Sequence, residues 1–219
     1  MFNLVLKDFK LISKYNIFIA IYGLILSFSG LKMGSNPGLL YVISIIIITY
    51  ISVLYSNGYD DKYKIHVSLN SMPIIRKEVV MAKYTSFILQ LIFTSGIIII
   101  FTLFLNLIGI KAAARTANIW DLIVSFNILG LFYAFYFPLY YKYDYNKLRI
   151  FNIGIYFLIL IMPGYIPKLL KYDVGTKLIN WVLSINNMNT IQLIILAIVF
   201  ILLIISYILS SQIYSKKEF

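Results

Sequence analysis

The side chains best suited to acid–base or metal chemistry lie in one polar stretch of this chain, residues 57–84. This stretch holds the single histidine, His66, and the adjacent carboxylates Asp60 and Asp61. Histidine titrates near neutral pH, and carboxylates are ligands for hard divalent cations. One histidine with no second histidine and no cysteine is a poor ligand set and a poor catalyst. We therefore interpret His66 as a loop residue and the two aspartates as part of a solvated turn.

The rest of the sequence contains no motif for ATP hydrolysis or for other catalysis. The chain has no cysteine and no glycine-rich phosphate loop of the GxxxxGKS/T form. The backbone of that loop cradles nucleotide phosphates, so we do not expect this chain to hydrolyse ATP. A lone histidine cannot serve a serine that lies within an apolar segment. The sequence therefore predicts no catalytic residue, no metal site and no cofactor on the chain.

The second half of the polar stretch has the composition of a docking surface. Ser71 can cap a helix, and Pro73 is tolerated in a first helical turn. Apolar and charged side chains then alternate, and an apolar patch with a polar rim is typical of partner-binding surfaces. An ordinary solvated loop is the alternative. The candidate docking residues are Ser71, Met72, Pro73, Ile74, Ile75, Arg76, Lys77, Glu78 and Val79, flanked by Asp60, Asp61, Lys62, Lys64 and His66.

Composition places the rest of the chain in a membrane. It is 61% hydrophobic and only 12% charged, with a mean hydropathy of +0.89, whereas soluble domains are roughly a quarter charged. A chain so poor in charge cannot cover a globular surface, so its surface must face lipid. The net charge of +11 would suggest nucleic acid in a soluble protein. Here the basic residues lie in short loops between apolar runs, so we expect lipid contact and no nucleic-acid partner.

The apolar runs predict an all-α polytopic membrane protein. A bilayer core of ~30 Å needs about 20 helical residues, and the runs lack the alternation of a β-barrel. We predict six transmembrane helices, forming a single transmembrane domain over residues 1–219. The predicted spans are 15–31, 38–56, a segment within 85–110, 122–141, 150–166 and 190–211.

An amphipathic segment precedes these spans. In residues 1–14, apolar side chains recur at helical spacing between lysines, and the segment is too short and too charged to cross a bilayer. We expect a helix that lies in the membrane interface. Its predicted apolar stripe is Phe2, Val5, Leu6, Phe9 and Ile12.

The distribution of basic residues predicts the orientation. If the N-terminus is cytoplasmic, thirteen of the nineteen lysines and arginines fall in cytoplasmic segments. Positive residues collect on the cytoplasmic side of membrane proteins. Both termini and residues 57–84 are therefore predicted to be cytoplasmic.

Polar residues within the predicted spans are few, and none is ionisable. Proton- and ion-coupled transporters keep carboxylates or histidines at depth, so energy is expected to enter from a partner. A deep tyrosine hydroxyl needs a hydrogen-bonding partner, which favours a position facing protein or a cavity. Helix packing explains such residues as well as a transport path does. The candidate path residues are Tyr133, Tyr136, Asn127 and Gln90.

The order of these segments resembles a known family. The opening segment Leu6-Lys7-Asp8-Phe9, the six predicted spans and the run SMPIIRKEVVMAKY between the second and third spans are similar to the small permease subunits of type-2 ABC exporters. The resemblance is nearest to the membrane subunits of bacterial peptide exporters of the phenol-soluble modulin type. It covers nearly the whole chain. Its most specific part is Ser71, Pro73, Arg76, Lys77, Glu78, Lys83 and Tyr84.

The resemblance implies a mechanism in which this chain is driven by another. Met72 to Val79 would form a coupling helix that inserts into a groove of a separate cytoplasmic ABC ATPase subunit. ATP and Mg²⁺ would bind that partner, and a second permease copy, identical or paralogous, would complete the pathway. The cargo would be an amphipathic or antimicrobial-type peptide, and the location a bacterial cell membrane.

Two other functions fit a six-helix membrane protein. One is the substrate-binding subunit of a vitamin-type uptake system, which would need a concave pocket that opens outward. The other is a non-transporting immunity protein that sequesters peptides.

Overall fold

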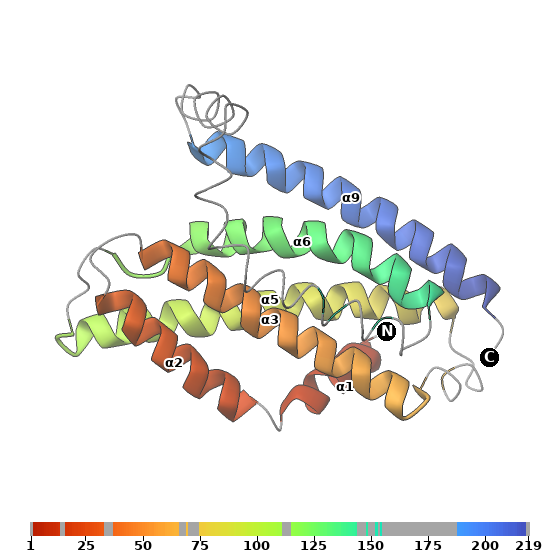
Figure 1. The fold of residues 1–219 in the computed structure, drawn as a ribbon, viewed down its shortest axis with the longest axis horizontal. Helices are drawn as coiled ribbons and strands as arrows, with labels where there is room; N and C mark the ends of the chain where they lie inside the picture. The colour runs from red at the N-terminus through yellow and green to blue at the C-terminus, as the bar shows by residue number, and fades with distance from the viewer. Residues whose placement is uncertain are drawn as a thin grey trace.

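The described part of the chain is helical and contains no strand, which confirms the predicted all-α class for those residues. Its helices are α1 (Phe2–Ser13), α2 (Asn16–Lys32), α3 (Pro37–Lys62), α5 (Arg76–Leu107), α6 (Ile119–Lys142) and α9 (Met188–Lys216) (Figure 1). The computed structural model describes residues 2–13, 16–32, 37–65, 69, 75–110, 115–143, 148, 152, 154 and 188–217.

Four of these helices are long and apolar enough to cross a membrane: α3, α5, α6 and α9 from Asn189 onward. The rise of about 1.5 Å per residue means that a ~30 Å core needs about 20 residues. With 17 residues, α2 is shorter. The predicted span 150–166 lies outside the described residues, so the count of six remains a prediction.

The helices extend beyond the predicted spans into the polar stretch 57–84. Helix α3 continues past Ser56 to Lys62, and α5 begins at Arg76, ahead of the uncharged run that starts at Thr85. Only residues 63–75 separate the two helices. Two of the charged side chains that suggested a loop, Asp60 and Lys83, are instead paired with each other inside the bundle.

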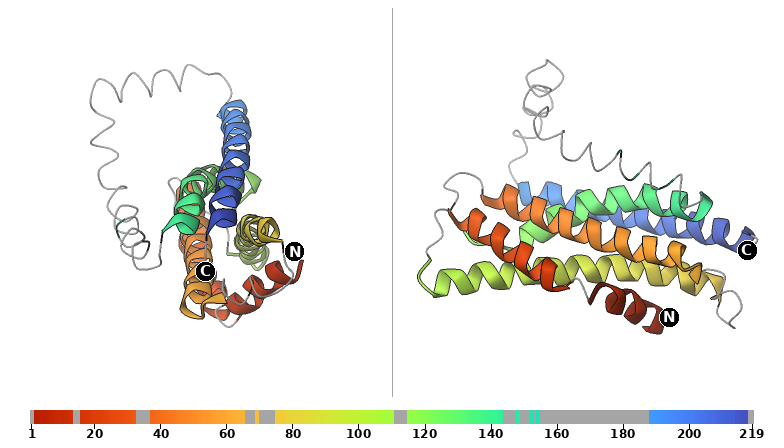
Figure 2. Two further views of the ribbon diagram at one scale, coloured as in Figure 1. Left: turned by 90° about the vertical axis from the view of Figure 1, so that its right-hand side faces the viewer. Right: turned by 60° about the horizontal axis from the view of Figure 1, so that its bottom comes forward.

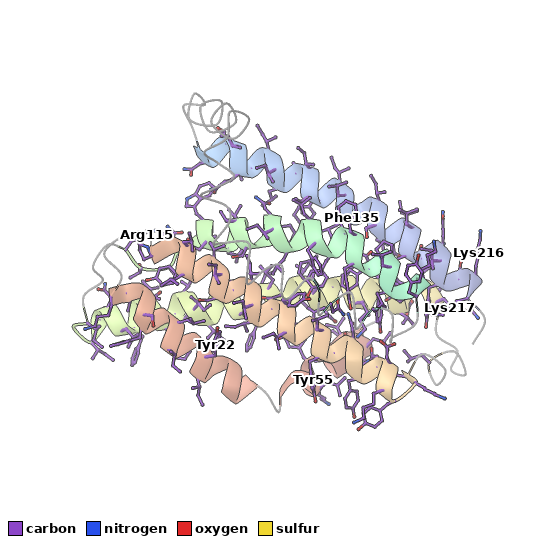
Figure 3. All side chains as sticks on the ribbon, in the orientation of Figure 1. Tyr22, Tyr55, Arg115, Phe135, Lys216 and Lys217 are labelled. Carbon is purple, nitrogen blue, oxygen red and sulfur yellow. The ribbon has the colours of Figure 1, made fainter. Side chains whose placement is uncertain are left out.

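The helices define two ends of an elongated bundle. At one end α3, α6 and α9 finish and α5 begins, close to α1 (Figure 1). We call this the loop end and the opposite one the far end. In Figure 3, Arg115 lies at the far end, and Lys216 and Lys217 lie at the loop end. The N-terminal helix and the last turn of α9 thus share one end of the bundle.

Helices α6 and α9 pack side by side and run in the same direction. Near the start of both, the Asn127 amide donates to the Gln192 carbonyl oxygen at 3.2 Å, and near their ends the rings of Tyr141 and Tyr214 lie 5.2 Å apart. Both helices therefore start at the far end and finish at the loop end.

Helix α1 lies alongside the first part of α5 (Figure 2) and also contacts α3. Its buried face contains Val5 and the carboxylate of Asp8, while Phe2 and Leu6 are exposed. The predicted apolar stripe is therefore divided: part of it packs on the bundle and part faces outward. The exposed part remains available to a membrane interface.

The centre of the bundle is aromatic. The ring of Tyr133 on α6 lies 4.4 Å from that of Phe87 on α5 and 5.1 Å from that of Phe137. All three residues are buried. Offset and edge-on ring pairs of this kind add to the energy of simple apolar burial.

Close approach of α6 and α9 depends on Gly130. A Cβ at this position would overlap the side chain of Val199. Valine is β-branched and Val199 is fully buried, so its side chain has little freedom to move away. Small residues allow helices to approach closely in membranes.

We predict that Gly130→Ala lowers the midpoint of thermal unfolding in detergent. Alanine favours a helix over glycine by about 1 kcal/mol, but overpacking a core costs about 1–3 kcal/mol. The matched control is Gly96→Ala on α5, where an added Cβ meets no other atom within 4 Å. The control should be neutral or stabilising. Equal midpoints for the two variants would contradict close packing at Gly130.

Candidate functional site

The described docking residues form the beginning of α5. Ile75 is the N-cap in extended conformation, with φ −69° and ψ 125°, and its side chain makes no capping hydrogen bond. Arg76, Lys77, Glu78 and Val79 form the first turn, so they are continuous with a helix long enough to cross a membrane. The remaining candidates, Ser71, Met72, Pro73, Ile74 and His66, lie outside the described residues.

A cluster of four charged residues and one hydroxyl joins three helices at the loop end; we call it the ion-pair cluster. The Lys83 ammonium on α5 lies 2.6 Å from an Asp60 oxygen on α3 and 3.1 Å from an Asp8 oxygen on α1. Lys83 also donates to the Ser56 hydroxyl at 3.0 Å. Lys7 on α1 donates to the other Asp60 oxygen at 2.7 Å. Two cations and two anions meet, so the cluster has no net charge.

The cluster is deeply buried. Asp8 and Asp60 are each 1% exposed, and Lys83 is 6% exposed. Buried charges are tolerated where they are paired and hydrogen-bonded, and removing one partner leaves the other charge uncompensated. The prediction that Asp60 belongs to a solvated turn is therefore wrong. Asp60 and Lys83 lie outside the predicted spans, but α3 and α5 extend beyond those spans and include them.

The other flanking residues are less enclosed. Asp61 is half-buried, and one of its oxygens accepts from the Tyr140 hydroxyl at 3.5 Å. Lys62 and Lys64 are exposed, and Lys62 lies over the ring of Tyr63 at 5.4 Å. These lysines have the positions expected of a solvated loop.

The spacing of the buried charges contained a signal for their position. Asp60 follows Ser56 by four residues, and Lys83 lies midway between the buried Val79 and Phe87. Residues four apart share a helix face. Extending the helical periodicity into the polar stretch would have placed Asp60 and Lys83 on inward faces, but not shown which residue each one meets.

A row of small polar residues continues from the cluster between α3 and α5. The hydroxyls of Thr49 and Thr94 lie 2.8 Å apart. Between this pair and the cluster lie Ser52, Ser86 and Gln90, all buried. Their side-chain oxygens find no hydrogen-bond partner among the described groups. The interface is therefore polar but only partly hydrogen-bonded.

The candidate path residues lie inside the bundle of a single chain. Tyr133 and Tyr136 are buried, as are Gln90 and Asn127. The Tyr136 hydroxyl accepts from the Asn152 amide at 3.3 Å. Burial among α3, α5 and α6 fits the packing alternative directly, and a path along these residues would require the helices to move apart.

Arg76 has a partner within the chain that the sequence did not suggest. Its guanidinium donates to the carbonyl oxygens of Ser215 at 2.7 Å and Lys217 at 3.2 Å. Carbonyls at a helix C-terminus have no intrahelical donors, and a cation there also complements the helix dipole. Arg76 thus ties the start of α5 to the end of α9.

The far end has a charge pair of its own. Arg115 donates to both Asp121 oxygens, at 2.6 and 2.8 Å. This bond is the main cause of a raised Arg115 pKa. Asn118 caps α6 and forms a capping box with Asp121. A cavity of about 630 Å³ adjoins the pair, but each charge there already meets its opposite.

Comparison with known proteins assigns the class. The family model described as ABC-2 family transporter protein matches residues 3–215. The chain therefore belongs to the ABC-2 transporter family and is a membrane permease component of an ABC transporter. Membership implies an ATPase partner and typically a dimeric arrangement. No curated protein and no solved structure matches the chain.

We predict that Lys83→Met strongly destabilises the protein, because it leaves the ion-pair cluster with one excess negative charge. Breaking a buried pair costs about 3–5 kcal/mol. Asp8→Asn should also destabilise, because it leaves one excess positive charge. The double variant restores neutrality and should be more stable than the sum of the single effects allows.

Thermal unfolding in detergent measures these effects. Lys62→Met, which removes an exposed lysine at the same end, serves as the control and should change the midpoint little. Additive effects of Lys83→Met and Asp8→Asn would show that the two side chains do not interact.

Proposed function

We propose that this chain is the membrane-spanning half of an ATP-driven exporter, and that its ATPase docks on the segment that leads into α5. The main support is the continuity of that segment with the helix. Ile75 is 64% exposed although it is apolar, and the next residue begins a helix of 32 residues. A rigid helix transmits a push on its first turn along its whole length.

The ion-pair cluster extends this transmission to other helices. Lys83 lies two turns into α5 and holds Asp60 of α3 and Asp8 of α1. Movement of the start of α5 would therefore displace α1 and α3 as well. Through Arg76 it would also act on the end of α9. In this mechanism ATP and Mg²⁺ bind the partner, whose closure moves the docking segment, and cargo passes between two permease copies.

Because Arg76 bonds to α9, a substitution of Arg76 cannot test docking by itself. Reversing its charge would place a carboxylate next to carbonyl oxygens of α9, so it would damage the fold as well as any interface. Exposed residues of the same segment test docking alone.

We predict that Ile75→Asp abolishes co-purification of the ATPase, because it introduces a charge into the apolar centre of the docking surface. The matched control is Ile119→Asp, since Ile119 is also 64% exposed but begins α6 at the far end. Both variants should insert into membranes and unfold at the parental temperature. Retained co-purification and unchanged ATP turnover in Ile75→Asp would exclude this docking surface.

The proposed cargo is an amphipathic peptide, on the basis of the resemblance to peptide exporters. In proteoliposomes that contain both subunits, we predict ATP-dependent transport of a fluorescent amphipathic helical peptide. A scrambled peptide of the same composition should be transported much less. Equal transport of both, or transport without ATP, would overturn the proposed cargo class.

The two alternative functions now have less support. The far-end cavity could offer a vitamin-type subunit its pocket, but Arg115 and Asp121 beside it are paired with each other. The family to which the chain belongs is one of transport components, which favours a permease over a sequestering immunity protein. Tight small-molecule binding by the isolated chain would reverse the first preference.

A further inference from the structure

An apolar groove runs along the surface between α5 and α9, in the half of the bundle nearer the loop end. Its volume is about 200 Å³. The exposed side chains at its mouth include Met81, Phe200 and Ile204. The groove is lined by Met81, Tyr84, Thr85, Phe87, Ile88, Phe200, Leu203, Ile204 and Tyr207.

The polar groups of the groove walls are already hydrogen-bonded. The Tyr84 hydroxyl lies 2.6 Å from that of Ser206 and 2.9 Å from that of Ser210. The Thr85 hydroxyl donates to the Met81 carbonyl oxygen at 2.8 Å. These bonds leave neither hydroxyl in need of water, so the groove suits a hydrocarbon chain.

A polar pocket of about 250 Å³ continues the groove toward the loop end. Tyr207 lines both. On α5, Lys77, Met81, Thr85 and Ile88 follow one another at steps of three or four residues, so they share a face of the helix. The polar pocket is lined by Lys77, Tyr207, Ile208, Ser211, Gln212 and Ser215.

Lys77 provides positive charge at this pocket. It is exposed, and among the described residues no ion pair involves it. Lys216 and Lys217 lie at the same end of α9 (Figure 3). The Ser211 and Ser215 hydroxyls already donate to the Ile208 and Gln212 carbonyl oxygens, at 2.9 and 2.8 Å. The ammonium of Lys77 and the side-chain amide of Gln212 are the donors that can bind a phosphodiester.

The length of α5 places the two parts at suitable depths. Its 32 residues span about 48 Å, whereas the hydrocarbon core is ~30 Å thick. Centred in a bilayer, the helix would extend into both headgroup layers. Lys77 in the first turn would then lie among headgroups, and Met81 to Ile88 would lie beside the part of the acyl chains nearest to those headgroups.

We propose that the groove and the polar pocket together bind one anionic phospholipid, with an acyl chain along α5 and α9 and the phosphate beside Lys77. The site shares Lys77 with the candidate docking residues, but lipid binding to the permease alone requires neither the ATPase nor the cargo. The bound lipid would contact both α5 and α9 on the side that faces the membrane and so stabilise their packing.

Native mass spectrometry of the delipidated full-length protein tests the site. We expect phosphatidylglycerol to bind more tightly than phosphatidylcholine, and glycerol phosphate, which has no acyl chains, not to compete. Competition by glycerol phosphate at similar concentration would indicate a free phosphate site, and equal binding of the two lipids would remove the role of charge. Either result overturns the proposal.

Two variants locate the site, each with a control. Lys77→Gln should weaken phosphatidylglycerol binding about fivefold, as expected for one basic residue near an anionic headgroup. Lys142→Gln, at the end of α6, should not. Thr85→Phe fills the groove and should reduce the binding of both lipids. Ile100→Phe, at an exposed position of α5 nearer the far end, should not.

Thermal unfolding confirms that each variant is folded before binding is measured. Unchanged lipid binding in folded Lys77→Gln and Thr85→Phe would overturn the site. If an amphipathic peptide displaces bound phosphatidylglycerol, and excess phosphatidylglycerol does not displace the peptide, the groove binds peptide instead.

Discussion

Charges buried within a helix bundle must meet their opposites, and this constraint organises the loop end of the molecule. An unpaired lysine or aspartate in an apolar interior is far too costly to persist as an ion. Lys83 of α5 forms an ion pair with Asp60 of α3. From α1, Asp8 pairs with Lys83 and Lys7 pairs with Asp60. The N-terminal helix is therefore an integral part of the bundle, because without it Lys83 would lose its contact with Asp8 and one Asp60 oxygen would lose its contact with Lys7.

This arrangement makes α5 the central element of the permease. It contacts α3 and α1 through the ion-pair cluster and α9 through Tyr84 and Arg76. Hydrogen bonds that involve charged groups are about twice as strong as neutral ones, so the ion-pair cluster and Arg76 join α5 firmly to its neighbours. A displacement of the first turn of α5 consequently reaches helices on both of its sides, while the aromatic core against α6 provides a packed support.

The sequence was sufficient for those features that depend on local pattern. Helical class and the approximate positions of four long helices follow from apolar runs and their lengths. The end of α3 did not follow, because the charged residues after Ser56 were taken as evidence of solvent. Asp60 and Lys83 lie in helices since they pair with each other, and Lys7 lies 53 residues from its partner Asp60. No periodicity reveals such a pairing. The bond from Arg76 to α9 spans 139 residues and was hidden for the same reason.

The interface between α3 and α5 differs from the rest of the bundle in a way that bears on movement. Small side chains such as Thr49, Ser52 and Ser86 separate the two helices, and several of their buried oxygens have no partner among the described groups. A tightly interdigitated apolar interface resists sliding, because side chains must leave their holes. Small hydroxyl groups can exchange partners over a short displacement, so this row would let α5 shift against α3 while the ion-pair cluster keeps them joined. This polar interface should therefore resist sliding of α5 against α3 less than an interdigitated apolar interface would.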